Sequence, residues 1–310
     1  MEIVLKVDSI QKKFGKITAV NSLSFSVKKG EIFALLGPNG AGKTTTVRML
    51  MDIIKPDNGS IEYFLINSSA TGLLQSHKHG YLPEERGLYL EIPILRTLEY
   101  MGVIRGMNKY DARKSSEMWL SKLELLDRKN EKLSTLSKGN QQKVQFISSV
   151  LHNPSFAILD EPFSGFDPIN QEAFLMIIKE LSNKGTTILL SAHQMHLVEK
   201  IADNVLLMNN GRKIAVGSIE ELKNESAASE ILILKYDGKP ELSFLKEDEA
   251  VERIENNTEG EVKIFIKQNK SLSGLLSNAA SKLKISSIRS DHLTLHDIFI
   301  EKVNKDKEQY

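Results

Sequence analysis

A glycine-rich run at residues 37–45, Gly-Pro-Asn-Gly-Ala-Gly-Lys-Thr-Thr, has the residue types needed to bind phosphate. Gly37, Gly42, Lys43 and Thr44 match the pattern G-x-x-x-x-G-K-[ST], in which backbone N–H groups of a curled loop point at phosphate oxygens. We expect Lys43 to reach the β- and γ-phosphates of a nucleotide, and the hydroxyl of Thr44 to ligate Mg²⁺. The residues that we assign to nucleotide binding in this loop are Gly37, Pro38, Asn39, Gly40, Ala41, Gly42, Lys43, Thr44 and Thr45.

Two adjacent carboxylates, Asp160 and Glu161, follow the apolar run at 155–159. Side chains at the carboxyl end of a buried parallel strand lie in the crevice where open α/β sheets bind ligands. Asp160 suits a contact to Mg²⁺ through water, and Glu161 is then placed to polarise the water that attacks the γ-phosphate. An Asp-Glu pair is also common in solvated surface turns, so the catalytic interpretation depends on the phosphate-binding loop upstream.

The elements that must position these groups alternate along the first two thirds of the chain. Residues 32–36 form an apolar run of the kind that is buried on both faces in a parallel sheet, and a helical stretch follows the loop at 43–51. Strand, loop and helix in that order begin an α/β unit. Further strands are expected at 3–10, 19–27, 155–159, 187–190 and 204–208, and helices within 95–150 and at 168–182.

The composition changes after about residue 222. Apolar runs at 231–234 and 262–266 predict strands, while stripes of leucine within 272–283 and apolar residues within 295–303 predict helices. The sequence therefore predicts a second, small α+β domain.

The overall composition excludes some classes of function. With 41 Lys plus Arg and 40 Asp plus Glu the net charge is only +1, so no nucleic-acid partner is expected. The chain has no cysteine, which excludes disulfides and thiolate metal sites. Apolar runs such as 32–36 and 187–190 are far shorter than the roughly 20 residues that cross a bilayer. Any role in transport is therefore expected to need a separate membrane subunit.

The segment Leu136-Ser-Lys-Gly-Asn-Gln-Gln142 lies just upstream of the carboxylates and resembles Leu-Ser-Gly-Gly-Gln, the signature of ABC transporter ATP-binding subunits. Together with the loop and the carboxylates, it makes the chain similar to that family from residue 3 to about 220. The resemblance implies a P-loop NTPase (RecA-like) α/β core with a mainly parallel sheet, an antiparallel β subdomain and a helical subdomain at about 90–150. The expected domains are an ATP-binding domain at 1–222 and the small α+β accessory domain at 223–310.

The resemblance also implies that two subunits pair head to tail, with ATP held between the loop of one and the signature of the other. Ser137, Gly139 and Asn140 would then contact ATP across a homodimer interface. The same residues also suit a helix N-cap, in which Ser137 satisfies a free N–H, and both interpretations can hold together. Lys138 replaces a signature glycine, and Asn140 replaces the glutamine.

Four further positions align with the family in order along the chain. Phe14 falls where an aromatic ring stacks on adenine, although a core phenylalanine is the alternative. Glu84 stands where the family has a glutamine that senses Mg²⁺, and a glutamate can still ligate the ion. Residues 164–167, Ser-Gly-Phe-Asp, resemble the D-loop that connects the two sites of the dimer. His193 matches the switch histidine that holds Glu161 and the attacking water.

The resemblance implies an ATPase that binds ATP and Mg²⁺. The ATPase would be attached to an integral-membrane permease. The chain would be cytoplasmic and attached peripherally to the inner face of the cell membrane. Residues 81–89 and 295–302 resemble the subfamily that powers small two-component exporters of sodium or drugs. An ABC ATPase that acts without a membrane partner is the alternative. A catalytically dead scaffold is disfavoured because Lys43, Glu161 and His193 are all present.

Overall fold

The computed structural model describes residues 2–64, 79–85, 87–238, 240–258 and 260–308. The chain divides into two compact units, residues 1–218 and 219–310, which are described separately. Among the helices of the described residues, none is long and apolar enough to cross a membrane.

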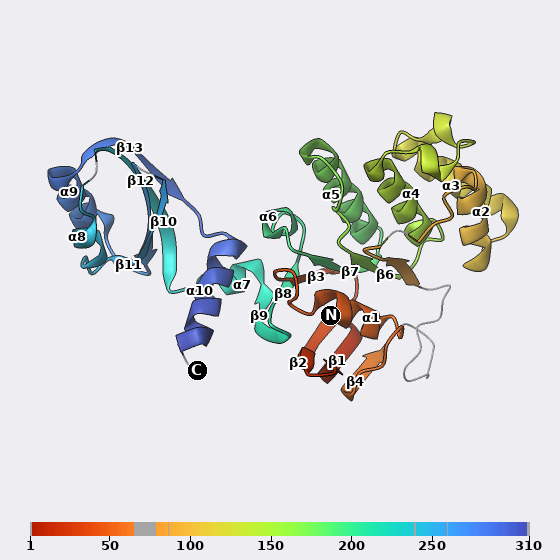
Figure 1. Ribbon diagram of the computed structural model, residues 1–310, viewed down its shortest axis with the longest axis horizontal. Coiled ribbons are helices and arrows are strands. Elements are labelled where there is room, and N and C mark those ends of the chain that lie inside the picture. The colour runs from red at the N-terminus through yellow and green to blue at the C-terminus, as the bar shows by residue number, and fades with distance from the viewer. Residues whose placement is uncertain (1, 65–78, 86, 239, 259, 309–310) are drawn as a thin grey trace. The chain divides into compact units, whose positions relative to one another are not determined.

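A six-stranded sheet in the order β5-β6-β7-β3-β8-β9 forms the centre of the first unit (Figure 1). All pairs are parallel except β8 with β9. Every residue of β3, β6 and β7 is buried, as their mainly apolar sequences require of strands covered on both faces. The strands are β3 (Ile32–Leu36), β5 (His79–Leu82), β6 (Phe156–Asp160), β7 (Thr187–Ala192), β8 (Asn204–Asn209) and β9 (Arg212–Ser218).

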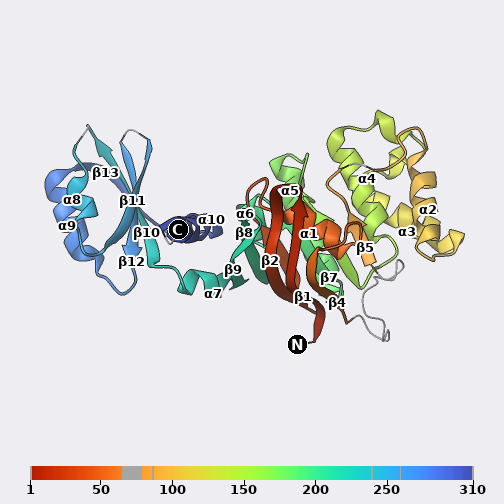
Figure 2. The same cartoon turned by 60° about the horizontal axis from the view of Figure 1, so that its bottom comes forward.

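A second, antiparallel sheet in the order β2-β1-β4 lies beside it, its strands side by side in Figure 2. Leu23, Phe25 and Val27 alternate with less buried polar residues, so one face of β2 enters the core. The ring of Phe25 stacks on Phe33 of the main sheet with centroids 5.3 Å apart. Helix α1 (Lys43–Leu50) packs between the two sheets. The strands of the second sheet are β1 (Ile3–Phe14), β2 (Ile17–Lys28) and β4 (Asn58–Tyr63).

Helices form the remainder of the first unit. A row of aromatic contacts, Trp119 to Phe146 to Phe174 to Phe166, joins three of them with successive centroid distances of 6.0, 4.5 and 4.8 Å. The helices are α2 (Ile94–Ile104), α3 (Lys109–Lys122), α4 (Lys138–Val150), α5 (Pro168–Asn183) and α6 (Met195–Val198), with short 3₁₀ turns at Leu126–Arg128 and Leu133–Thr135.

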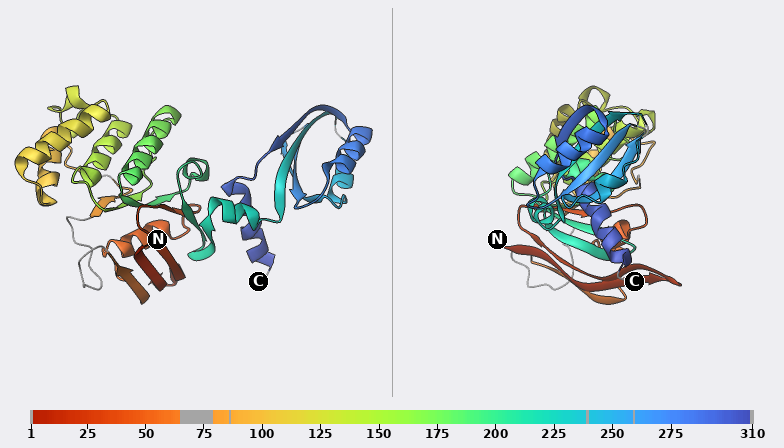
Figure 3. Two further views of the ribbon diagram at one scale, coloured as in Figure 1. Left: turned by 180° about the vertical axis from the view of Figure 1, so that it is seen from behind. Right: turned by 90° about the vertical axis from the view of Figure 1, so that its left-hand side faces the viewer.

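The second unit is an antiparallel sheet in the order β11-β12-β10-β13. Leu232, Leu234 and Ile264 lie on the face that packs against Leu275 and Ala279, and helices α8 and α9 cover that face in Figure 3. The strands are β10 (Ala228–Asp237), β11 (Val251–Thr258), β12 (Glu261–Lys267) and β13 (Lys284–Asp291), and the helices are α7 (Ile219–Asn224), α8 (Ser243–Lys246), α9 (Leu272–Lys282) and α10 (Leu295–Glu308).

Candidate active site

The phosphate-binding loop joins β3 to α1 and depends on glycine at both ends. Gly42 has φ 97°, a left-handed conformation, and a Cβ there would lie 2.4 Å from the carbonyl oxygen of Ala19. At Gly37 a Cβ would lie 2.3 Å from the carbonyl oxygen of Met208. The loop can therefore pack against β2 and β8 only because these side chains are absent. The first turn of α1, with its free N–H groups, then faces the loop's interior as an anion-binding end.

Lys43 is held at the centre of this loop. Its Nζ donates hydrogen bonds to the carbonyl oxygens of Gly37 (2.8 Å) and Pro38 (3.2 Å) and lies 3.7 Å from Oε1 of Glu161. The lysine is only 6% exposed, so its charge acts with little screening by water. This places a positive charge between the loop and the carboxylate at the end of β6.

Glu161 also contacts His193, which follows β7. Nδ1 of His193 lies 2.9 Å from Oε2 of Glu161, a hydrogen bond in which the ring N–H donates. The backbone of Glu161 has φ 48°, a left-handed conformation that is costly for a residue with a side chain. Its N–H donates to the carbonyl oxygen of Ser191 at 3.1 Å, and this contact to β7 holds the strained conformation. The carboxylate is thus fixed between a lysine and a histidine.

Asp160 is fully buried beside this pair. One carboxylate oxygen accepts a hydrogen bond from the Ser191 hydroxyl, and the other, Oδ2, has no hydrogen-bond partner among the described residues. Burial, together with the carboxylates of Glu84 and Glu161, raises the pKa of the Asp160 carboxyl to about 6, against the lowering effect of Ser191. An orphaned oxygen in a cluster of negative charge favours an added cation.

The hydroxyl of Thr44 donates to Oε2 of Glu84 at 3.2 Å, which brings the start of α1 next to the segment after β5. Within the described ranges, no three His, Cys, Asp or Glu side chains gather closely enough to hold a metal by themselves. Mg²⁺ is usually bound by one or two carboxylates together with water and substrate phosphates. The hydroxyl of Thr44 and the carboxylates of Glu84 and Asp160 therefore fit a Mg²⁺ ion whose other ligands are water and phosphate.

A cavity of about 480 Å³ opens over the loop, a volume suited to a nucleotide. It is lined by residues 39–45, by Glu84 and Glu161, and by Ile17, Thr18, Ala19 and Asn210. Phe14 is half exposed and is not among the lining residues, so its stacking on adenine stays a prediction. Sequence reasoning missed Ile17, Thr18 and Ala19, which start β2; their position beside the loop depends on the close approach of Ala19 to Gly42.

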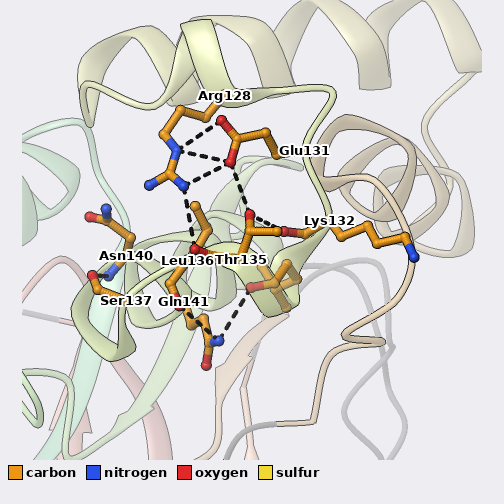
Figure 4. Close-up of polar contacts among 9 residues, drawn as sticks. Arg128, Glu131, Lys132, Thr135, Leu136, Ser137, Asn140 and Gln141 are labelled. Carbon is orange, nitrogen blue, oxygen red and sulfur yellow. Dashed lines mark hydrogen bonds and ion pairs between the residues drawn. The ribbon is translucent and has the colours of Figure 1, made fainter.

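The signature segment lies at the start of α4, where the predicted N-cap is present. The Ser137 hydroxyl accepts a hydrogen bond from the backbone N–H of Asn140 at 3.3 Å, and Gln141 donates to the carbonyls of Leu133 and Leu136 (Figure 4). A Cβ on Gly139 would lie 3.2 Å from the carbonyl oxygen of Gly165. None of Ser137, Gly139 and Asn140 lines the described cavity. The structure therefore brings together the loop, Glu84, Asp160, Glu161 and His193, and leaves the signature apart.

Comparison with known proteins shows which family the chain belongs to. Residues 20–164 match the ABC transporter family, and the chain is 38% identical over 300 residues to the uncharacterized ABC transporter ATP-binding protein YhaQ of Bacillus subtilis, covering 97% of this chain and 98% of that protein. The chain belongs to the ABC transporter family. It is an ATP-binding subunit and an ATPase of the kind that couples hydrolysis to transport.

Other matches extend over both units of this ABC subunit. Residues 217–303 match the C-terminal domain of DrrA1-3-like ATP-binding proteins. The chain is 32% identical to the Nod factor export ATP-binding protein I of Ralstonia nicotianae over 83% of this chain and 79% of that protein. A solved ATP-binding subunit of an ABC transporter has a TM-score of 0.64 and 28% identity, covering 72% of this chain and 92% of that chain.

The raised pKa of Asp160 predicts that this residue destabilises the fold. Because the pKa in the folded protein (about 6) lies above the usual 3.9 of an unfolded chain, ionisation opposes folding at neutral pH, and the cost disappears as the pH falls below about 4. Without Mg²⁺, Asp160→Asn should therefore raise the free energy of unfolding at pH 8 by about 1–3 kcal/mol, with a smaller gain at pH 5. Denaturant titration measures both values.

Asp167 is the control for this prediction, because the backbone N–H and the side chain of Asn170 both donate to it and lower its pKa. Asp167→Ala removes the N-cap of α5 and should lower the free energy of unfolding at pH 8. A loss of stability in Asp160→Asn at pH 8 would contradict the prediction.

Proposed function

We propose that the chain is the ATP-hydrolysing subunit of an ABC exporter, and that it acts as a homodimer bound to a separate integral-membrane permease. The catalytic part of this proposal rests on the contacts of Glu161 with Lys43 and with His193, at the edge of a nucleotide-sized cavity. In this proposal residues 1–218 are the ATP-binding domain and residues 219–310 are an accessory domain. The chain would lie on the cytoplasmic face of the membrane, attached through the permease.

Each residue of the site has a distinct role in the proposed reaction. Lys43 and the N–H groups of the loop bind the β- and γ-phosphates, and Glu161 orients the attacking water. His193 positions Glu161, because its ring N–H occupies one carboxylate oxygen and leaves the other to face Lys43. Thr44, Glu84 and Asp160 would hold Mg²⁺, which when bound neutralises charge on the phosphates.

The proposal of a homodimer rests on the signature residues, which do not line the cavity. The resemblance of 136–142 to the family's signature implies that Ser137 and the backbone of Gly139 contact ATP, yet neither residue lines the cavity of its own chain. Ser137 is exposed at the start of α4, where free N–H groups and the helix dipole favour an anion. We infer that the anion is the γ-phosphate of ATP on a second copy, so that each site is completed across the interface.

The proposal of a membrane partner rests on an exposed apolar surface at residues 89–104. Tyr100 and Ile104 share one face of α2 by their spacing, and both are more than half exposed. Tyr89, Leu90 and Val103 are exposed nearby in sequence. Clusters of exposed apolar residues mark surfaces that meet partners. Movement of this helical region on ATP binding would transmit the cycle to the permease, and the similarity to a Nod factor export ATP-binding protein supports export as the direction.

Replacing the proposed catalytic carboxylate tests the reaction. Glu161→Gln keeps the hydrogen bond to His193 available but cannot polarise water as a carboxylate does, so hydrolysis should fall by about 10²-fold or more. ATP binding should persist, and the variant should form a stable dimer with ATP that elutes at twice the mass in size-exclusion chromatography with light scattering. Normal hydrolysis by this variant would refute the assignment of Glu161.

Charges on the apolar surface test the membrane partner. The double change Tyr100→Glu and Ile104→Glu should lower recovery of a polytopic membrane protein from detergent-solubilised native membranes by about tenfold or more, because buried charges oppose docking. The hydrolysis rate of the purified subunit should stay unchanged. Tyr110→Glu, on the exposed side of α3, is the matched control and should leave recovery intact. Equal recovery with both variants would exclude this surface as the docking site.

A further inference from the structure

Gln145 is a buried polar residue of α4 that the proposed reaction does not use. It lies two turns after Ser137 and is only 3% exposed. Its Nε2 donates hydrogen bonds to the carbonyl oxygens of Pro83 (3.3 Å) and Glu85 (3.0 Å). These two carbonyls flank Glu84, so one side chain holds the backbone on both sides of it.

The segment that Gln145 holds has left the sheet. β5 ends at Leu82, and beyond it the backbone carbonyls need partners other than a neighbouring strand. A second contact to the segment, Arg48 to Glu85 at 3.6 Å, joins two exposed side chains and contributes little. The hydrogen bonds from Gln145 come from a buried side chain and are partly removed from water, so they are the stronger constraint on where Glu84 lies.

Glu84 in turn contacts the phosphate-binding loop, through the 3.2 Å hydrogen bond that its Oε2 accepts from the Thr44 hydroxyl. Gln145 on α4 is therefore linked to Thr44 by its hydrogen bonds to the carbonyls of Pro83 and Glu85, by the covalent chain through Glu84, and by the hydrogen bond of Glu84 to Thr44. The same helix begins at Ser137, the N-cap of the signature.

We propose that Gln145 is a positioning residue for Glu84. It fixes the Glu84 carboxylate beside Thr44, and it makes α4 and Glu84 move as one body, so that the helix that serves a partner's ATP also sets the magnesium-binding carboxylate of its own subunit. This inference rests on the proposed role of Glu84 at the metal.

The test is the magnesium requirement of ATP hydrolysis by the purified chain. Gln145→Met keeps the length and burial of the side chain and removes the amide donor. The free Mg²⁺ concentration for half-maximal rate should rise about fivefold or more, because the change removes both hydrogen bonds, to the carbonyls of Pro83 and Glu85, and each is worth about 1 kcal/mol. Affinity for a fluorescent ATP analogue in EDTA should stay within about twofold, since the loop itself is unchanged.

Two variants serve as references. Glu84→Ala should raise the magnesium requirement in the same way, and combining it with Gln145→Met should add little, because both changes act on one carboxylate. Gln142→Met is the matched control: Gln142 is buried on the same helix, and its Nε2 has no hydrogen-bond partner among the described residues. Its magnesium requirement should equal that of the original protein.

Folding of each variant can be read from Trp119, the chain's single tryptophan, which is buried against Phe146 of α4. If Gln145→Met shifts its emission, Gln145→Asn is the milder variant. It keeps an amide that is one methylene too short to reach both carbonyls, and the magnesium requirement should again rise.

The outcomes separate this inference from the proposed function. An unchanged requirement in folded Gln145→Met or Gln145→Asn, with a raised requirement in Glu84→Ala, would overturn the role of Gln145 alone. A raised requirement in Gln142→Met would also overturn it, because the effect would come from packing within α4. An unchanged requirement in Glu84→Ala would refute the proposed metal role of Glu84, and the inference with it.

Discussion

The pairing of Lys43 with Glu161 is the interaction on which the rest of the active site depends. Both groups are nearly buried and lie 3.7 Å apart, and a buried charge without a partner is strongly destabilising. The loop carbonyls on Lys43 and the imidazole on Glu161 complete the set of contacts that keeps the two charges in place. The strained backbone of Glu161 belongs to the same arrangement, because β7 holds it by a hydrogen bond.

A parallel sheet is what makes this pairing possible. The phosphate-binding loop follows β3, the carboxylates follow β6, His193 follows β7 and Glu84 follows β5, so segments far apart in sequence meet at one edge. The signature is at the start of a helix instead, away from that edge. The fold thus builds most of the candidate active site in one chain, and the proposed dimer would supply the remainder. Gln145 would link the two parts within each subunit.

The sequence predicted most of this site because its chemistry is local. The loop at 37–45 and the pair Asp160–Glu161 each lie in one run of sequence, and buried parallel strands such as 187–190 are recognisable as continuous apolar runs. Other features depend on tertiary contacts with no local pattern. The lining of the cavity by Ile17, Thr18 and Ala19 depends on the approach of β2 to Gly42, and the contact of Gln145 spans 60 residues. The edge strand β13 is exposed along most of its length and therefore has no apolar signal.

Mixing two inactive variants tests most directly whether two chains build each site. Lys43→Ala disables the loop, and Ser137→Arg disables the signature. In a head-to-tail dimer of one with the other, both defects fall in one site and the second site is intact. The account predicts that the mixture hydrolyses ATP well above the summed rates of the separate variants, whereas a mixture of Lys43→Ala with Glu161→Gln does not. No recovery in the first mixture, with mixed dimers shown to form, would contradict it.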